Sequence, residues 1–229
     1  MILDEEYSFI ACPYCGHPKK IMTMISGNFC WYSRWSDGVN IFPMLLSYPT
    51  VLKCKGCCAF YWFEERIEIE DREFTEFGRK LSKIADKLTT LSVEEYYEAI
   101  NNKVFCFNAE IEKKLRILAW RRWNDNFRGN ANKIQVEFPD RTEQWIGNEF
   151  LFDCSDRTKQ WTDNLNVLNN LLNDNDETEC LMKGEICRNL GRFQEAKGIL
   201  MKLNNPKYQN IISQLIRFCD MRVTEVRAI

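Results

Sequence analysis

The sequence predicts an α+β protein in which a small antiparallel β module, residues 1–71, precedes an antiparallel array of α-helices, residues 72–229. Two observations predict this fold class. Short runs of β-branched and aromatic residues alternate with turn signals up to about residue 71, and beyond it apolar residues recur at helical spacing. A chain of 229 residues is long enough for two small domains, each with its own core.

Four short runs in the first module have the composition of strands. They are residues 7–10, 29–32, 51–54 and 60–63. Turn-forming residues separate them, among them Gly27, Gly38, Pro43 and Pro49. The module is therefore expected to be a small antiparallel sheet.

The helical part begins with an apolar stripe at the spacing of an amphipathic helix, formed by Phe74, Phe77, Leu81, Ile84 and Leu88. Ser92, with Glu95 three residues on, forms a capping-box pattern that opens a second helix, and Asn108 caps a third. Residues 128–142 resemble a connecting loop, with one strand at 134–138. Later helices are expected around Trp161 to Leu172 and over about 177–190, 193–203 and 207–222.

Composition and charge exclude some classes of protein and favour others. The formal net charge of -2 gives no dominant attraction to nucleic acid or anionic lipid. No apolar run approaches the roughly 20 residues that cross a bilayer, so no membrane partner is expected. Residues 1–6 lack the basic and apolar regions of a signal peptide, and a cytoplasmic location follows as an expectation. Eleven cysteines in a reducing compartment point to metal binding rather than to a disulfide framework.

The strongest chemical signal is a pair of Cys-x-x-Cys motifs, formed by Cys12 with Cys15 and by Cys54 with Cys57. Two intervening residues let a tight turn direct both sulfurs at one ion, and four thiolates suit tetrahedral Zn²⁺. Thiolate ligands also disfavour Mg²⁺ and Ca²⁺. These four cysteines are the predicted metal ligands.

Gly16 and Gly56 fit these motifs, because such turns often need a positive φ that glycine adopts readily. The 38 residues between the motifs exceed the usual spacing of roughly 15 to 20, and a hairpin or small insertion would account for the excess. Over residues 8–63 the pattern resembles the zinc-ribbon superfamily, which implies a structural Zn²⁺ held by the four cysteines. Such a closed site leaves no open position for catalysis at the metal.

Other interpretations of the cysteine-rich region stay open. Each Cys-x-x-Cys alone could be a redox dithiol. Cys58 could replace a ligand, although its position beside Cys57 directs it to the other side of the strand. Cys30 fits the interior of the sheet. The only histidine, His17, could replace a cysteine or be a solvent-facing turn residue, and the second reading is favoured.

An aromatic and arginine-containing stretch lies between the motifs. Trp31, Arg34 and Trp35 could form a partner-binding surface. The favoured alternative is a hairpin that turns at Asp37 and Gly38 and packs alternate aromatics on the small core of the β module.

Residues 177–206 resemble a single tetratricopeptide-like helical hairpin. The likeness rests on Gly184, Leu190, Gly191, Phe193, Ala196 and Leu200. Cys180, Lys183 and Cys187 depart from the family pattern, and no second copy is evident, whereas solenoids normally need about three units. The resemblance implies peptide or protein binding in a helical groove.

These features together predict a zinc-binding intracellular protein-interaction or adaptor protein. The alternative is a nucleic-acid-binding or regulatory zinc-ribbon protein that uses Lys19, Lys20, Lys53, Lys55 and Arg34. The acidic run at residues 64–71 opposes it. An enzyme is not expected, because no phosphate-cradling glycine loop, nucleophile elbow or HExxH motif occurs.

Overall fold

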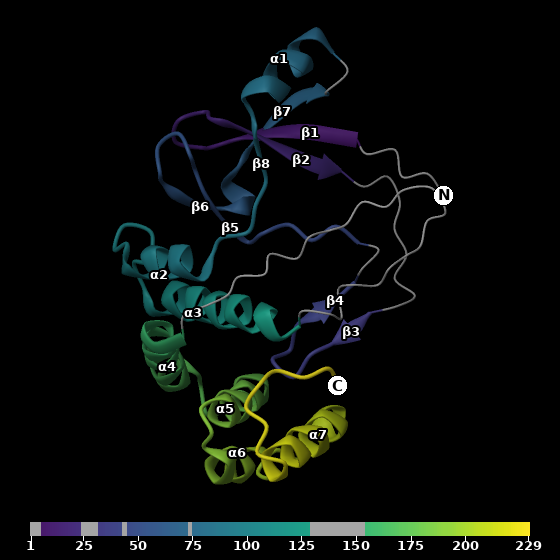
Figure 1. Cartoon of the computed structure of the whole chain (residues 1–229), viewed down its shortest axis with the longest axis vertical. Coiled ribbons are helices and arrows are strands. Elements are labelled where there is room, and N and C mark those ends of the chain that lie inside the picture. Colours follow the sequence, from purple (N-terminus) through teal and green to yellow (C-terminus); the bar gives the residue numbers. More distant parts are fainter. Residues whose placement is uncertain (1–5, 24–31, 43–44, 73–74, 129–153) are drawn as a thin grey trace. The chain divides into compact units, whose positions relative to one another are not determined.

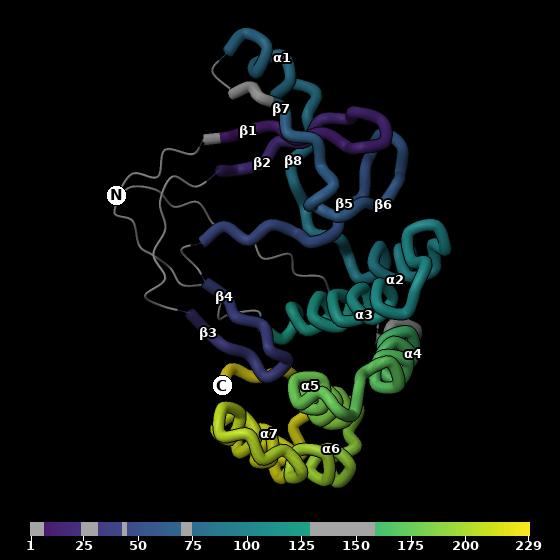
Figure 2. The backbone as a smooth tube through the Cα atoms, turned by 180° about the vertical axis from the view of Figure 1, so that it is seen from behind, coloured from purple at the N-terminus to yellow at the C-terminus, as the bar shows by residue number. Residues whose placement is uncertain are grey.

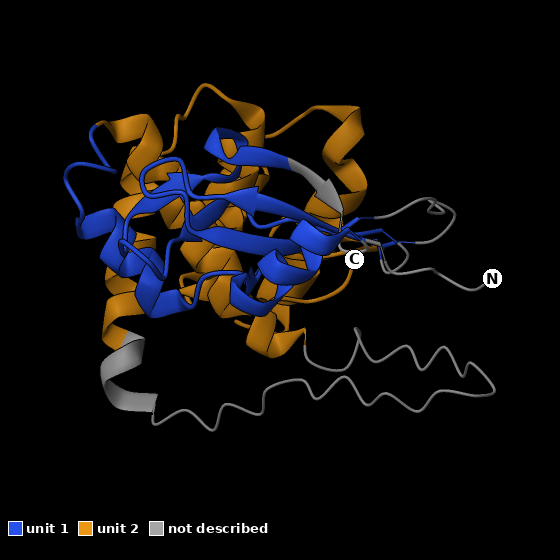
Figure 3. Ribbon diagram, turned by 90° about the horizontal axis from the view of Figure 1, so that it is seen from above, with its two compact units in different colours: residues 1–32, 42–107 blue, residues 33–41, 108–229 orange. Residues whose placement is uncertain are grey.

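The computed structural model describes residues 6–23, 32–42, 45–72, 75–128 and 154–229. The chain divides into two compact units (Figure 3): unit 1 comprises residues 1–32 and 42–107, and unit 2 comprises residues 33–41 and 108–229. This division differs from the expected boundary at residues 71 and 72. Residues 72–107 group with the strands, and residues 33–41 group with the helical unit.

Small antiparallel strands followed by helices make this an α+β protein, as the sequence predicts. Unit 1 contains a four-stranded sheet whose strands, in spatial order, are β7 (Ile67–Arg72), β1 (Glu6–Ala11), β2 (Pro18–Thr23) and β8 (Asp86–Lys87) (Figure 1). β1 pairs antiparallel with β2 and β7, and β8 lies parallel to β2. A separate antiparallel hairpin is formed by β5 (Val51–Lys53) and β6 (Phe60–Trp62).

The two hairpins of unit 1 carry the two cysteine motifs in their turns. One turn joins β1 to β2 and the other joins β5 to β6, and the two turns lie side by side (Figure 2). Behind them a small hydrophobic core contains the first cysteine of each motif. Its buried members are Ile10, Cys12, Ile21, Leu52, Cys54 and Tyr61.

Two helices complete unit 1, α1 (Glu76–Ile84) and α2 (Val93–Asn101). The capping box that opens α2 is confirmed: the Glu95 backbone N–H donates to Ser92 Oγ at 3.1 Å, and the Ser92 backbone N–H donates to Glu95 Oε2 at 2.9 Å. In α1 the predicted apolar stripe is only partly correct. Leu81 is buried, but Phe77 and Ile84 are exposed, and the helix ends at Ile84, before Leu88.

Unit 2 is mainly helical. Its long elements are α3 (Ala109–Asn124), α4 (Cys154–Leu171), α5 (Glu177–Asn189), α6 (Phe193–Leu200) and α7 (Gln209–Asp220). α3 packs on α4, α4 on α5, and α5 on both α6 and α7. One core cluster joins Trp120 of α3 to Leu165 and Leu168 of α4 and Ile186 of α5. Asn108 caps α3 as predicted, its Oδ1 accepting from the Ile111 N–H at 2.9 Å.

α5 and α6 pack closely through a small residue. A Cβ at Gly184 would lie 2.6 Å from Leu200 Cδ2, so only glycine permits this approach. Gly191, with φ +74°, turns the chain between the helices. The helices thus pack as the small residues predict, and both end earlier than expected, at Asn189 and Leu200.

A hairpin with its turn at Asp37 and Gly38, as expected for the aromatic stretch between the motifs, is confirmed, and its paired strands span residues 33–41. β3 (Ser33–Arg34) pairs antiparallel with β4 (Asn40–Ile41), and Gly38 has φ +80° in the turn. The hairpin packs within unit 2, not on the small core of the β module. Asp37 is buried there, forms an ion pair with buried Arg128 and accepts from Asn124 Nδ2 at 2.9 Å.

A second buried network holds the chain's last residues. The buried side chains of Glu185 and Arg188 form an ion pair, and Ser36 Oγ donates to Glu185 Oε1 at 2.6 Å. Arg188 also donates to the backbone carbonyl of Glu225, and Asn189 Nδ2 donates to that of Thr224 at 2.7 Å. The hairpin, α5 and residues 223–229 therefore form one polar core in unit 2.

Candidate metal centre

The four predicted ligands come together. The sulfur atoms of Cys12, Cys15, Cys54 and Cys57 all lie within 4.8 Å of one another. The distance is 3.8 Å between the Cys12 and Cys57 sulfurs and 3.5 Å between those of Cys15 and Cys54. A Zn–S bond of about 2.3 Å in a tetrahedron places sulfurs about 3.8 Å apart. A disulfide would need about 2.05 Å, so the spacing fits four ligands of one ion.

The two turns have the same backbone hydrogen bonds. We call residues 12–17 the first knuckle and residues 54–59 the second. In the first, the Cys12 N–H donates to the His17 carbonyl at 3.0 Å and the Gly16 N–H donates to the Cys12 carbonyl at 2.9 Å. In the second, the Cys54 N–H donates to the Ala59 carbonyl and the Cys58 N–H donates to the Cys54 carbonyl, both at 2.9 Å. The knuckles therefore correspond residue by residue.

This correspondence corrects one prediction. Gly16 has the expected positive φ of +71°, but its equivalent in the second knuckle is Cys58, with φ +60°. Gly56 does not share this conformation. Space is restricted there, because a Cβ would lie 3.1 Å from the Cβ and Cγ atoms of His17, closer than most Cβ contacts. Cys58 itself is exposed and does not belong to the sulfur cluster.

Burial divides the four ligands into two pairs. Cys12 and Cys54 are buried, whereas Cys15 and Cys57 are exposed. Burial raises the pKa of the Cys12 thiol to about 12, and hydrogen bonding with the Cys54 and Cys57 side chains adds to the rise. Such a group becomes a thiolate at neutral pH only when a cation compensates its charge.

The Cys54 thiol has the opposite shift. Burial acts to raise its pKa, but hydrogen bonds from the backbone N–H of Cys57, from the Cys15 side chain and from the backbone N–H of Gly56 outweigh burial and lower it to about 7. The Gly56 N–H donates to Cys54 Sγ at 3.3 Å. N–H groups directed at sulfur are what a metal-bound thiolate requires, and this donor set fits a thiophilic ion such as Zn²⁺.

His17 is not part of the sulfur cluster. Its Nε2 lies 2.8 Å from Asp86 Oδ2, and Lys55 Nζ donates to Asp86 Oδ1 at 3.0 Å. Asp86 therefore joins the residue that ends the first knuckle to one inside the second. Sequence reasoning misses Asp86, because it lies on β8, far along the chain from both motifs.

Two of the three residues of the predicted partner surface, Arg34 and Trp35, are described by the structure. Trp31 lies outside the described residues. Arg34 is exposed, but Trp35 is only 5% exposed, so it contributes to the interior of unit 2 and not to a surface. Its inward direction follows from the alternation of side chains along β3, which continues into a bridge between Trp35 and Ala228.

The lysines of the nucleic-acid alternative are engaged within unit 1. Lys53 pairs with Glu98 at 2.6 Å and Lys55 pairs with Asp86. Lys20 Nζ donates to Ser82 Oγ at 3.2 Å, and Lys19 is buried. The carboxylates of Glu98 and Asp86 therefore offset the positive charges of Lys53 and Lys55.

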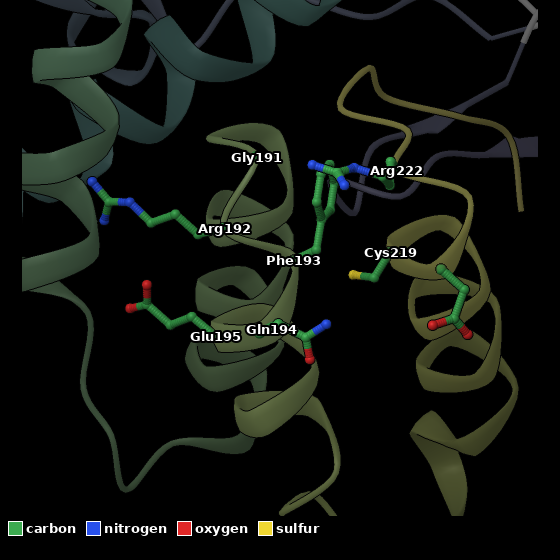
Figure 4. Close-up of a pocket in the computed structure, with 8 residues that line it drawn as sticks. Gly191, Arg192, Phe193, Gln194, Glu195, Cys219 and Arg222 are labelled. Carbon is green, nitrogen blue, oxygen red and sulfur yellow. The ribbon is translucent and has the colours of Figure 1, made fainter.

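A shallow pocket lies in unit 2 between the start of α6 and the end of α7 (Figure 4). Its volume is about 430 Å³, and its lining includes Arg192, Phe193, Gln194, Glu195, Cys219, Asp220 and Arg222. Arg192 NH2 donates to Asn166 Oδ1 at 2.6 Å, while the guanidinium of Arg222 lies over the Phe193 ring, 5.7 Å from its centroid. The lining thus combines one aromatic ring with charges of both signs.

Comparisons of the chain with protein-family models, with curated proteins and with solved structures find no match. In the part of the chain that the structure describes, no helix has the length and apolar character needed to cross a bilayer.

Proposed function

We propose that this chain is a zinc-binding adaptor protein, in which a structural Zn²⁺ organises a zinc-ribbon unit and the helical unit binds a protein partner. The observation that carries the zinc assignment is the cluster of four sulfurs within 4.8 Å of one another, presented by two equivalent knuckles. Four cysteine ligands close the coordination shell, so the ion's role is structural.

The ion would stabilise unit 1 by joining its two hairpins. Cys12 and Cys54 belong to the same small hydrophobic cluster. A sheet and hairpin of this size bury little apolar surface, and small metal-bound modules gain much of their folding free energy from the ion. Cys12, Cys15, Cys54 and Cys57 would hold the ion, and two of them, Cys12 and Cys54, belong to that core.

Metal analysis of single-cysteine variants tests the zinc assignment. Purified wild-type protein is expected to contain one zinc per chain, and Cys57→Ser is expected to lose it and to lower the free energy of unfolding of unit 1. Cys58→Ser is the matched control, because Cys58 is the exposed neighbour outside the cluster. Retention of zinc by Cys57→Ser, or its loss only in Cys58→Ser, would refute the ligand set.

The interaction role is supported by the helical hairpin and by the pocket at its base. The close approach of Gly184 to Leu200 and the turn at Gly191 are features of tetratricopeptide-like hairpins. Beside this hairpin, the pocket offers the Phe193 ring with Arg222 above it. An aromatic ring flanked by arginine is a common anchor in protein interfaces, so we assign partner binding to this pocket.

Charge reversal at the pocket tests that assignment. Arg222→Glu is expected to abolish stoichiometric retention of a partner from native cells, whereas Arg217→Glu is the control, because Arg217 is exposed on α7 but does not line the pocket. Equal retention by the two variants would place the partner site elsewhere. Absence of any stoichiometric partner with wild type would count against an adaptor.

A further inference from the structure

The two knuckles are held together by a contact that needs no ion. The Asp86 carboxylate accepts from His17 Nε2 through Oδ2, at 2.8 Å, and from Lys55 Nζ through Oδ1, at 3.0 Å. His17 belongs to the first knuckle and Lys55 to the second. One side chain on β8 therefore bridges both turns, and its position is fixed because β8 pairs with β2 through Lys19 and Asp86.

Packing adds two more restraints of the same kind. The backbone of the second knuckle lies against the imidazole of the first, since a Cβ at Gly56 would be 3.1 Å from His17 Cβ. Cys12 and Cys54, the first cysteine of each knuckle, are buried in one hydrophobic cluster. Each of these contacts is formed by protein atoms alone.

The other two sulfurs lie on the solvent side. Cys15 and Cys57, the second cysteine of each knuckle, are both exposed. An incoming soft ligand, such as a small thiol or a chelator, can therefore reach an ion at this site from the side of Cys15 and Cys57, while the buried pair keeps its place in the core.

We propose that the metal centre exchanges its ion in the folded protein, with Asp86 as the positioning residue that keeps the knuckles together in the metal-free state. This inference rests on the proposed zinc site and adds a property to it. Many small zinc modules unfold when the metal is removed. Here the bridge through Asp86 preserves the arrangement of the four sulfurs, so zinc can leave and rebind without unfolding of unit 1.

Disulfide mapping of the metal-free full chain measures whether the knuckles stay together. In an unfolded chain, cysteines three positions apart meet far more often than cysteines about forty positions apart. After mild oxidation with glutathione disulfide, the share of disulfides between knuckles, Cys12–Cys57 and Cys15–Cys54, therefore reports their proximity. We expect these pairs to predominate in wild type and to fall several-fold in Asp86→Asn, whose neutral amide cannot accept from both donors.

Glu98→Gln is the matched control. It removes one carboxylate that pairs with a lysine in unit 1, at 2.6 Å from Lys53 Nζ, but it joins α2 to β5 and bridges no knuckles. It should leave the disulfide pattern and the zinc affinity unchanged. Asp86→Asn should weaken zinc binding by about tenfold in competition with a chelator, the lower end of the effect of groups that position metal ligands.

The outcomes separate this inference from the proposed function. A wild-type chain that binds no zinc refutes the zinc site itself. A chain that binds zinc but, when metal-free, forms only Cys12–Cys15 and Cys54–Cys57 disulfides overturns the inference alone, as does a wild-type pattern in Asp86→Asn. If Asp86→Asn does not fold, Lys55→Met removes one arm of the bridge; a reduced share of inter-knuckle disulfides supports the proposal, and an unchanged share overturns it.

Discussion

Gly16 and Cys58 adopt the same left-handed backbone conformation, but its conformational free energy differs between the two residues. They are equivalent positions of the two knuckles, with φ of +71° and +60°. Glycine adopts this left-handed region freely, whereas a residue with a Cβ is strained there by roughly 1–2 kcal/mol. The second knuckle therefore carries strain that the first does not.

Adding a glycine at position 58 and removing the glycine at position 16 should change the free energy of unfolding in opposite directions. Cys58→Gly should raise the free energy of unfolding of the zinc-loaded protein by about 0.5–1 kcal/mol, after the greater freedom of glycine in the unfolded chain is counted. Gly16→Ala should lower it by about 1 kcal/mol. Urea unfolding followed by circular dichroism measures both. A Cys58→Gly protein less stable than wild type would contradict the argument.

At the scale of elements, α5 and α6 depend on the missing side chain at Gly184. Leu200 is buried and its Cδ2 would lie 2.6 Å from an added Cβ, so neither helix can accept the atom without shifting. Gly198, on the exposed side of α6, has nothing within 4 Å of an added Cβ. The two glycines in one hairpin thus have different physical roles.

Substituting each of these two glycines by alanine should distinguish the effect of packing on stability from the effect of helix propensity. Gly184→Ala is expected to destabilise unit 2 by about 1–3 kcal/mol through overpacking. Gly198→Ala should stabilise it by up to about 1 kcal/mol, because alanine is the better helix former. Thermal unfolding of the two variants beside wild type measures the difference. Destabilisation by both would mean that α6 packs differently.

Local signals in the sequence were sufficient for some elements and not for others. The caps at Ser92 and Asn108 and the ligand spacing in each knuckle are encoded within a few residues, and the structure has them. The strand β7 was missed, although Ile67 and Ile69 alternate with glutamates at the period of a strand. This stretch enters the prediction of function only as an acidic run that opposes nucleic-acid binding.

Longer-range features could not be read from spacing. Nothing local shows that Trp35 packs in unit 2, because its burial depends on residues near the end of the chain. Asp86 bridges knuckles that lie far from it in sequence, and the strand β8 that positions it is two residues long. The sequence therefore indicates the four cysteines that cluster but not Asp86, which contacts both knuckles.

At the scale of the whole molecule, the two units are interleaved along the chain. The first knuckle is followed by the hairpin at residues 33–41, which belongs to unit 2, and then by the second knuckle in unit 1. An ion joining the knuckles closes a loop that contains this hairpin. Loop closure by an ion reduces the conformational freedom that the hairpin loses when unit 2 folds.

Metal removal should therefore lower the stability of both units, and that of unit 1 more than that of unit 2. Hydrogen exchange with and without a chelator should show reduced but still measurable protection at core amides of unit 1, such as Leu52 and Tyr61, because unit 1 loses the stabilisation that the ion supplies but stays folded. At core amides of unit 2, such as Leu168 and Ile186, the free energy of the opening that permits exchange should fall by about 1 kcal/mol or less. Unchanged protection in unit 2 would mean that the packing of the hairpin at residues 33–41 does not depend on the loop that the ion closes between the knuckles.

The coordination shell of bound zinc tests the central claim most directly. X-ray absorption at the zinc edge of the purified, zinc-loaded protein should show four sulfur neighbours at about 2.3 Å and no nitrogen or oxygen ligand. Fewer than four sulfurs, or a shell containing oxygen or nitrogen, would contradict a site formed by Cys12, Cys15, Cys54 and Cys57.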